Sequence, residues 1–300
     1  MIEFFDPSNQ MFLTGMSRIM TREQRAQQQL TTGLKINTVS DDPDHIGNLM
    51  QVRTSLAQNE QITSNLGRVK TETDTAEGAL SNAVKLLENI STLASEGQPN
   101  TQTADTRSQI AGEVGSVLQQ MVGIANSNVE GRFIFSGDTD QTQPYTIDQS
   151  NSTVSAYAGA AATRQIQHPD GSLFPISKTA QEIFQSADPT TNVFAVVAGL
   201  HAALLNNDQA GIDAAVTNLQ GASTYLNNQL AFYGTVQNRV NSGVDFAANL
   251  QTQLQTEQSG IQDADLTSAI TELNQAATQQ QAALAAEKEM PRTSLFNFLA

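Results

Sequence analysis

A long apolar stripe runs through residues 43–95. Its members recur at alternating steps of three and four residues, which places them on one face of an α-helix. The fourteen positions are Leu49, Val52, Leu56, Asn59, Thr63, Leu66, Val69, Thr73, Ala76, Leu80, Ala83, Leu87, Ile90 and Ala94. Although three of them are polar, a stripe of this length predicts one long helix that pairs with a partner helix as in a coiled coil.

A second long stripe occupies residues 209–259. Its main members lie seven residues apart: Leu219, Leu226, Tyr233, Val240, Ala247, Leu254 and Ile261. A sustained seven-residue period predicts a helix that supercoils against a partner. Shorter helices are expected at 103–128 and 192–205. We expect all four segments to share an intramolecular core, with the chain running out along one long helix and returning along the other.

Both ends of the chain carry narrower stripes. Residues 8–32 predict a helix that Gly33 ends, with a seam of Phe12, Met16, Ile19, Ala26 and Leu30 that Glu23 interrupts. Residues 265–289 predict a last helix with a stripe of Leu266, Ile270, Leu273, Ala277 and Leu284. Because such thin seams make an isolated helix marginal, we expect partner molecules to supply part of the burial. An intramolecular core is the alternative.

The period changes in the middle of the chain. Residues 131–137 read GRFIFSG, a short β signature between glycines, and further strands are expected at 145–148, 153–157, 163–168 and 173–176. The run His168–Ser172 contains Pro169 and Gly171 and predicts a turn. Residues 138–189 therefore predict a small β insertion, which we expect to fold apart from the helices.

Composition and charge exclude several classes of function. The chain has 30 acidic and 15 basic residues among 300, and its net charge of −15 disfavours nucleic acid and anionic membrane surfaces as partners. It has no cysteine, which excludes disulfides and thiolate metal sites. No apolar run is long enough to span a membrane. The first seven residues are too polar for a secretory signal peptide, so any export is expected to proceed without a cleaved leader.

No arrangement of residues predicts catalysis, a cofactor or a metal. His45, His168 and His201 lie in separate segments, and no His-Glu-x-x-His, nucleotide-binding or Gly-x-Ser-x-Gly motif occurs. The acidic run at 41–44 lacks the glycine and later glutamate of a calcium loop, so helix capping explains it better. An enzyme carried on a helical scaffold is a remote alternative.

Two separated segments carry a resemblance to a known family. Residues 30–43 read LTTGLKINTVSDDP and 261–266 read IQDADL, and both resemble the terminal regions of the flagellin family. Within that family, the Asp-Asp-Pro run, the GRFIFSG segment and the ending SLF at 294–296 resemble the hook-associated members at the hook-filament junction more than filament flagellins. The resemblance rests on a set of residues and implies that they take part in assembly. They are Leu30, Gly33, Ile36, Asn37, Asp41, Asp42, Pro43, Gly131, Arg132, Phe133, Phe135, Gly137, Asp263, Asp265, Leu295 and Phe296.

The resemblance implies a mainly α fold: a long antiparallel helical coiled-coil rod with a small β insertion domain. It implies an inner domain of residues 1–40 with 264–300, a rod domain of 41–137 with 190–263, and an insertion at 138–189. The implied function is a structural subunit, not an enzyme, at the hook-filament junction of an extracellular flagellum. Its implied partners are hook-associated protein 1, flagellin, a ring of its own copies and a flagellar export chaperone. A flagellin of the filament itself and, more remotely, a helical surface adhesin are the alternatives.

Overall fold

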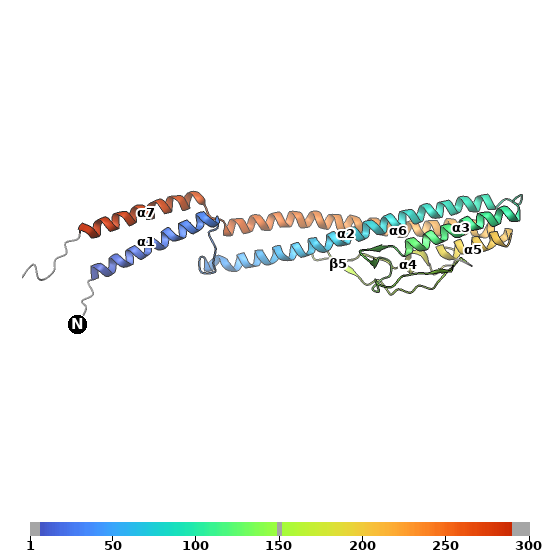
Figure 1. Ribbon diagram of the computed structural model, residues 1–300, viewed down its shortest axis with the longest axis horizontal. Coiled ribbons are helices and arrows are strands. Elements are labelled where there is room, and N and C mark those ends of the chain that lie inside the picture. The colour runs from blue at the N-terminus through green and yellow to red at the C-terminus, as the bar shows by residue number, and fades with distance from the viewer. Residues whose placement is uncertain (1–6, 149–151, 290–300) are drawn as a thin grey trace, which may run out of the picture. The chain divides into compact units, whose positions relative to one another are not determined.

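The computed structural model describes residues 7–148 and 152–289, and the chain divides into two compact units (Figure 1). Unit 1 comprises residues 1–58 and 251–300, and unit 2 comprises 59–250. The helices are α1 (Pro7–Thr32), α2 (Pro43–Gly97), α3 (Ala104–Ala125), α4 (Ala180–Phe184), α5 (Val193–Leu205), α6 (Gln209–Gln262) and α7 (Leu266–Glu289). The predicted fold class, mainly α with long antiparallel helices and small strand pairs, is confirmed.

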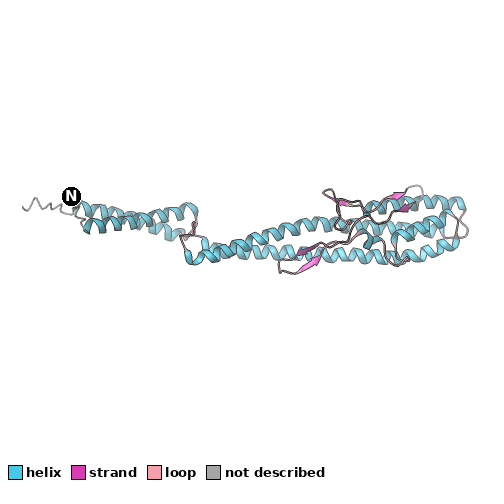
Figure 2. Cartoon of the chain, turned by 90° about the horizontal axis from the view of Figure 1, so that it is seen from below, coloured by secondary structure: helices cyan, strands magenta, loops and turns pink. Residues whose placement is uncertain are grey.

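Helices α2 and α6 lie side by side and run antiparallel in both views (Figure 1, Figure 2). Hydrogen bonds connect them in reversed order along the chain: Lys70 Nζ donates to Asn241 Oδ1 at 2.8 Å, and Gln98, the residue after α2, donates from Nε2 to Asp213 Oδ1 at 3.0 Å. All fourteen positions of the predicted α2 stripe are buried or half-buried. The period of three and four residues therefore identified the packed face correctly.

The polar member Asn59 sits in this seam with only 2% of its surface exposed. Its Nδ2 donates to the Ala247 carbonyl of α6 at 2.9 Å, while its Oδ1 has no hydrogen-bond partner. A buried amide in an apolar seam disfavours other helix registers because it loses its partner in them. Asn59 thus favours the alignment of α2 with α6.

Shorter helices complete the core of unit 2. Thr103 caps the start of α3 and Asn192 caps the start of α5, each through a side-chain oxygen that accepts a backbone N–H. Helix α3 ends three residues before its predicted end, and α5 ends at the predicted residue. Helix α4 was not predicted; it has only five residues and begins with a capping box between Thr179 and Glu182.

Three two-stranded antiparallel hairpins lie in unit 2 and appear as the magenta arrows of Figure 2. They pair β1 (Asn128–Val129) with β2 (Arg132–Phe133), β3 (Ile147–Asp148) with β4 (Thr153–Val154), and β5 (Gln165–Gln167) with β6 (Leu173–Pro175). The predicted strands are in the right places but longer than the observed ones. Only two residues of the GRFIFSG segment form a strand, because Phe135 turns into the core of unit 2 instead of continuing the ladder.

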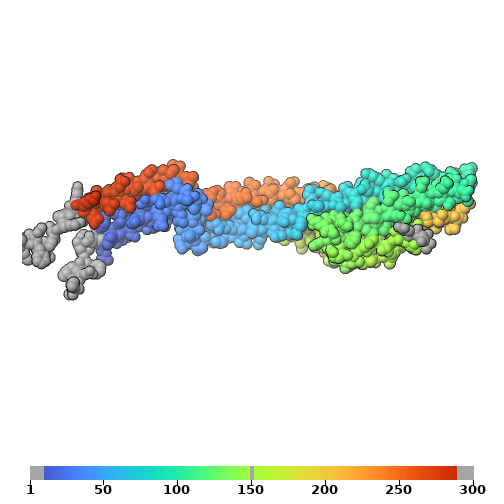
Figure 3. All heavy atoms as spheres, viewed as in Figure 1, coloured from blue at the N-terminus to red at the C-terminus, as the bar shows by residue number. Residues whose placement is uncertain are grey.

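The insertion does not fold apart from the helices, so that expectation is wrong. Tyr145, Ile183 and Phe184 are fully buried and belong to the same apolar cluster as Leu80 of α2 and Leu226 of α6. The rings of Phe184 and Phe194 stack at 5.0 Å. Figure 3 shows the green residues of this region covering one side of the helices. The domain boundaries themselves stay a prediction.

In unit 1, α1 and α7 pack against each other along an antiparallel seam. The predicted α1 seam is correct, because Phe12, Met16 and Ile19 are half-buried and Ala26 is 1% exposed. The predicted α7 stripe is correct only in part, because Leu273 and Ala277 are half-buried. The fully buried positions of α7, among the described residues, are Ala269 and Ala276.

Leu266, Ile270 and Leu284 of α7 are instead 45–51% exposed. The fully buried positions of α7 are thus small residues, which let two helices approach closely. Leu273 and Ala277 lie at the border of this buried face, whereas Leu266, Ile270 and Leu284 turn outward.

Candidate functional site

The two terminal motifs meet in unit 1. The backbone N–H groups of Lys35 and Ile36 donate to the Gln262 carbonyl at 2.7 and 3.3 Å, and Ala264 N donates to the Gly33 carbonyl at 2.9 Å. Leu34 and Asp263 form a β-bridge at the same place. The structure therefore brings residues 33–36 and 262–264 together as one crossing, which we call the terminal crossing.

Gly33 and Ile36 shape this crossing. Gly33 follows the last residue of α1 with φ of +74°, a left-handed conformation that ends helices and that favours glycine. Its N–H donates to the Gln29 carbonyl at 2.8 Å, which closes the last turn. Ile36 is 2% exposed, whereas Leu30 is half-buried near the end of α1. The loop is thus anchored by one buried side chain.

Asp41 and Asp42 have separate structural roles. Asp41 Oδ2 accepts the backbone N–H groups of Thr38 and Asn37 at 2.6 and 2.9 Å, and these bonds hold the pKa of Asp41 below its usual value. Asp42 precedes Pro43, the first residue of α2, and accepts the N–H of His45. Helix capping, the role expected for this acidic run, is therefore the role of Asp42.

Asp42 also connects His45 and Lys35, a pairing that the sequence analysis did not predict. His45 Nδ1 lies 2.8 Å from one of its oxygens and Lys35 Nζ lies 3.3 Å from the other. The hydrogen bond with His45, and then that from Lys35, lower the pKa of Asp42. The signal in the sequence was a histidine three residues after Asp42 and a lysine seven residues before it.

Asp265 caps the start of α7. Its Oδ1 accepts the N–H groups of Thr267 and Ser268 at 2.9 and 3.2 Å, and the Ser268 hydroxyl donates to Oδ2 at 2.9 Å. The hydrogen bond from the Ser268 hydroxyl, and then that from its backbone N–H, lower the pKa of Asp265. Asp263 is exposed and accepts the Ser259 hydroxyl at the end of α6. Both motif carboxylates therefore serve helix ends.

The GRFIFSG segment lies in unit 2, as a group separate from the terminal crossing. Gly131 forms the β1–β2 turn, Arg132 is exposed, and Phe133 is half-buried. Phe135 is fully buried against the ring of Tyr233, with centroids 6.1 Å apart. Gly137 has φ of +66°, and a Cβ there would lie 2.0 Å from the Ala160 carbonyl oxygen, so the close approach of these two segments requires glycine.

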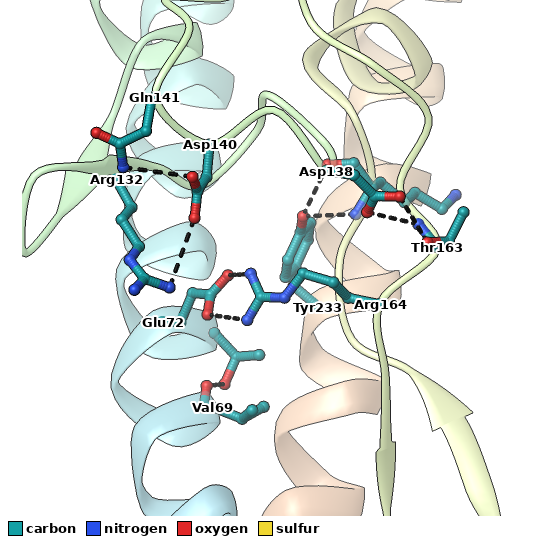
Figure 4. A network of polar contacts seen from close by, with 11 residues as sticks. Val69, Glu72, Arg132, Asp138, Asp140, Gln141, Thr163, Arg164 and Tyr233 are labelled. Atoms are coloured by element: carbon teal, nitrogen blue, oxygen red, sulfur yellow. Dashed lines mark hydrogen bonds and ion pairs between the residues drawn. The ribbon is translucent and has the colours of Figure 1, made fainter.

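Ion pairs hold the insertion to α2 and to β2 beside this segment. Arg164 donates two hydrogen bonds of 2.6 and 2.8 Å to Glu72 of α2, and Arg132 of β2 lies 3.5 Å from Asp140 (Figure 4). Donation to the Glu72 carboxylate raises the pKa of Arg164. A forked pair of this kind fixes orientation as well as distance. No local pattern in the sequence indicates this pair, because the two residues are 92 positions apart.

Asp138 joins two further parts of the insertion. It accepts the hydroxyl and the N–H of Thr163, and these contacts lower its pKa (Figure 4). Asp138 therefore ties the residues just after the GRFIFSG segment to those just before β5.

Nothing in the described residues assembles a metal site. No group of three or more His, Asp or Glu side chains lies close enough together there to hold an ion. Burial lowers the pKa of His201, whose Nε2 lies 3.5 Å from Ser152 Oγ, which fits a neutral side chain packed on a helix face. Within residues 7–148 and 152–289, no helix has the length and hydropathy of a membrane span. Leu295 and Phe296 lie outside the described residues.

Comparison with known proteins identifies the family. Residues 8–140 match the model of the bacterial flagellin N-terminal helical region, and 205–299 match that of the C-terminal helical region. Over 292 residues the chain is 26% identical to flagellar hook-associated protein 3 of Escherichia coli K12, covering 90% of each protein. It is 23% identical to a flagellin of Halalkalibacterium halodurans, covering 92% of each.

A solved structure shares the fold. It is that of a protein of Vibrio parahaemolyticus described as a flagellar hook-associated protein, with a TM-score of 0.66 and 21% identity over 74% of this chain and all of that one. Because the two terminal family models together match well over half of the residues, and in the expected order, the chain belongs to the flagellin family.

Proposed function

We propose that the chain is the structural subunit that joins the hook to the filament of a bacterial flagellum. The observation that carries this proposal is the end-to-end similarity to hook-associated protein 3, which extends over 90% of both proteins and includes the middle of the chain. The Asp41–Pro43 run and the GRFIFSG segment favour the same assignment. We propose no catalytic role, since the singled-out polar residues serve helix ends and turns.

The surface of unit 1 supports a role in assembly. Eight of the eleven large apolar side chains that are exposed in the described part of the chain lie in this unit: Met11, Leu13, Met20, Val39, Met50, Leu266, Ile270 and Leu284. Exposed apolar stripes of this kind mark protein–protein contacts. Burying one such side chain stabilises a contact by roughly 1.5–3 kcal/mol, and the gain recurs at every equivalent position of a ring.

The proposed partners differ in their place in the flagellum. Hook-associated protein 1 would lie below the ring, flagellin above it, and further copies of the chain beside it. An export chaperone would bind the chain before assembly. Export without a cleaved leader, to a site outside the cell, stays a prediction.

A flagellin of the filament is the second candidate. The flagellin of Halalkalibacterium halodurans matches 92% of both chains at 23% identity, so the length of the match alone does not separate the two functions. Copy number separates them, because a junction protein forms one ring whereas flagellin fills the whole filament.

The decisive experiment is immunogold labelling of isolated flagella in electron micrographs, with a strain that lacks the gene as the control. The junction assignment predicts label only where hook meets filament, and hooks without filaments in the deleted strain. Uniform label along the filament would identify the chain as flagellin instead. Label elsewhere on the cell, with normal flagella in the deleted strain, would contradict both functions.

The C-terminal segment offers a second test. Residues 290–300 include Leu295 and Phe296, which the family resemblance places in assembly. If the segment buries these side chains in the ring, truncated protein should still be exported but should not hold filaments. Cells would then release flagellin into the medium, measurable by immunoblot. Normal filaments in cells with only the truncated protein would show that residues 290–300 are not needed to hold the filament.

A further inference from the structure

The ladder of the β5–β6 hairpin shows which backbone groups point between its strands. His168 N donates to the Ser172 carbonyl at 2.8 Å, and Ile176 N donates to the Arg164 carbonyl at 3.4 Å. In an antiparallel pair, hydrogen-bonded positions alternate with positions whose backbone groups point outward. Ile166 lies midway between the bonded positions 164 and 168, so it too points its backbone groups toward β6.

The outward-pointing groups of β5 belong to Gln165 and Gln167, and both residues are exposed. Across residues 7–148 and 152–289, no hydrogen bond involves the N–H or the carbonyl of either residue. The outer edge of β5 therefore presents two free donors and two free acceptors in strand geometry.

The opposite edge of the hairpin is different. The residues across from Gln165 and Gln167 are Pro175 and Leu173, whose backbones point outward from β6. Pro175 has no N–H to donate, and a proline on an edge strand blocks pairing with a further strand. Pro175 thus protects the β6 edge of the hairpin from pairing with a further strand, whereas the β5 edge is open to such pairing.

The open edge borders a groove of about 660 Å³ within unit 2. Residues 64–72 of α2, the β1–β2 hairpin and β5 line this groove, whereas no residue of β6 does. The free backbone groups of β5 therefore face a space already bounded on two further sides. Figure 4 shows the polar side chains around it, with Arg132 and Asp140 next to the pair of Glu72 and Arg164.

The charge of the groove differs from that of the chain. Its lining includes Arg68, Arg132 and Arg164 against Glu72, Glu130 and Asp140, a balance of one to one. In the whole chain, acidic residues outnumber basic ones by 30 to 15. The groove is therefore much less repulsive to carboxylates than the protein as a whole.

Two of the groove's arginines are available to a partner. Arg68 donates to Asn65 but has no ion pair in the described chain, and the Arg132 side chain is 69% exposed. The carboxylate of Glu72, in contrast, is already bound by the fork of Arg164. An incoming carboxylate thus finds cations that are free or loosely paired.

The groove also has an apolar side. Ile166 is 7% exposed and Val69 is 6% exposed, and both line it. Because side chains alternate along a strand, a strand added beside β5 would direct every second side chain toward these residues and the others toward solvent and the arginines. The groove therefore fits an extended chain that alternates apolar and acidic residues.

We propose that the free edge of β5 binds an extended acidic segment of a neighbouring flagellar protein as an added strand. The backbone groups of Gln165 and Gln167 supply the hydrogen bonds, and Arg68 and Arg132 receive the carboxylates. The identity of the neighbour as a flagellar protein rests on the function proposed above. The binding edge rests on the geometry of unit 2 alone.

A matched pair of proline variants tests the edge. Gln167 and Leu173 lie directly opposite each other at a non-hydrogen-bonded position, so proline at either one removes a single outward N–H and leaves the ladder intact. We expect Gln167→Pro and Leu173→Pro to be exported and to melt at similar temperatures. Only Gln167→Pro should reduce the fraction of hooks that carry filaments, by severalfold in electron micrographs. Equal filament counts for the two variants would contradict the proposal.

Hydrogen–deuterium exchange of the wild-type chain gives a test that does not depend on a variant folding. In the purified protein, the amides of Gln165 and Gln167 should exchange faster than those of Ile166 and His168. In isolated flagella they should slow at least tenfold. If the protein is absent from the flagella, the proposed function fails; if it is present and these two amides exchange as in the purified chain, the added strand fails alone.

Discussion

The two units of the chain use the same kind of long helix but bury it differently. Unit 2 contains both clusters of buried apolar side chains found in the described residues, with aromatic rings such as Phe135, Phe184 and Tyr233 inside them. Unit 1 buries the small side chains Ala269 and Ala276 of α7 and leaves Leu266, Ile270 and Leu284 exposed. Amphipathic helices can therefore bury their apolar side chains in the core of their own chain or expose them for contact with another molecule. The size of the residues on the inner face decides between the two.

The largest expected effect comes from placing a charge on each type of helix face. Leu226 is fully buried in unit 2, so Leu226→Asp buries a carboxylate without a partner and should lower the free energy of unfolding by more than about 4 kcal/mol. Ile270 is 51% exposed in unit 1, so Ile270→Asp should change stability by less than about 0.5 kcal/mol. Chemical denaturation followed by circular dichroism measures both.

The same pair should reverse its order in assembly. Ile270→Asp should fold normally yet prevent filaments from being held at the hook, since a charge would then occupy an apolar contact. A large loss of stability in Ile270→Asp would show that this side chain belongs to the core of the monomer, and the contrast between the units would fail.

The next effect tests whether the insertion belongs to the core of unit 2. Phe184 is fully buried and stacks on Phe194 of α5, so Phe184→Ala should cost about 3–4 kcal/mol and lower the melting temperature of the helices. Leu173→Ala, at a side chain 65% exposed in the same insertion, is the control and should have little effect. If the helices of Phe184→Ala melt as in the wild type, the insertion folds apart from the helices, as the sequence predicted.

A smaller effect concerns a buried cation at the turns of unit 2. Arg107 is 3% exposed and, in the described chain, pairs with no carboxylate. It donates instead to the carbonyls of Gly97 and Pro99 at 3.0 and 3.1 Å, to Asn207 at 2.7 Å and to Gln209. The partial negative charge at the end of α2 therefore replaces a counter-ion.

Arg107→Met keeps the length of the side chain but leaves these acceptors buried without a donor. We expect a loss of about 2–3 kcal/mol in thermal or chemical unfolding. Arg53→Met, at an exposed arginine of α2, is the control. A neutral or stabilising result for Arg107→Met would mean that desolvation of the guanidinium outweighs its hydrogen bonds.

The sequence predicted local structure far better than the side of a helix that would be buried. The α2 stripe was correct because fourteen positions at helical period leave only one face to bury. The α7 stripe was correct only for Leu273 and Ala277, because two faces compete: hydrophobicity ranks Leu266 and Ile270 above Ala269 and Ala276, whereas the close pairing of α1 and α7 buries the alanines. Periodicity measures how apolar a face is and not how much space its partner leaves.

The candidate sites show a similar division. The capping roles of Asp42 and Asp265 follow from their position just before a helix, because a carboxylate there meets free N–H groups. The contact of Gly33 with Ala264, and that of Glu72 with Arg164, join residues far apart in sequence. No local pattern encodes such contacts. The family resemblance placed both ends of the terminal crossing in one inner domain, but it did not indicate which residues are in contact.

The smallest expected effect is a pH dependence of the pairing between α1 and α7. Arg22 of α1 contacts Glu272 of α7 at 2.5 Å and Gln279 at 3.0 Å. The hydrogen bond from Arg22, followed by its charge, lowers the pKa of Glu272 from 4.5. A carboxyl whose pKa is lower in the folded state stabilises that state above the unfolded pKa, and the contribution is lost as the pH falls through the folded value.

The pairing of α1 with α7 should therefore loosen as the pH falls below about 4.5, and added salt should weaken it at neutral pH because both partners are exposed. Hydrogen–deuterium exchange of α1 peptides measures the change locally, which matters because carboxyls of unit 2 such as Asp138 also have a lowered pKa. Glu272→Gln should remove most of this pH dependence, whereas Glu60→Gln, at an exposed residue of α2, should preserve it. If the protection factors of α1 amides, corrected for the intrinsic pH dependence of exchange, are equal at pH 7 and pH 3.5 in the wild type, the ion pair contributes nothing to the pairing of α1 with α7.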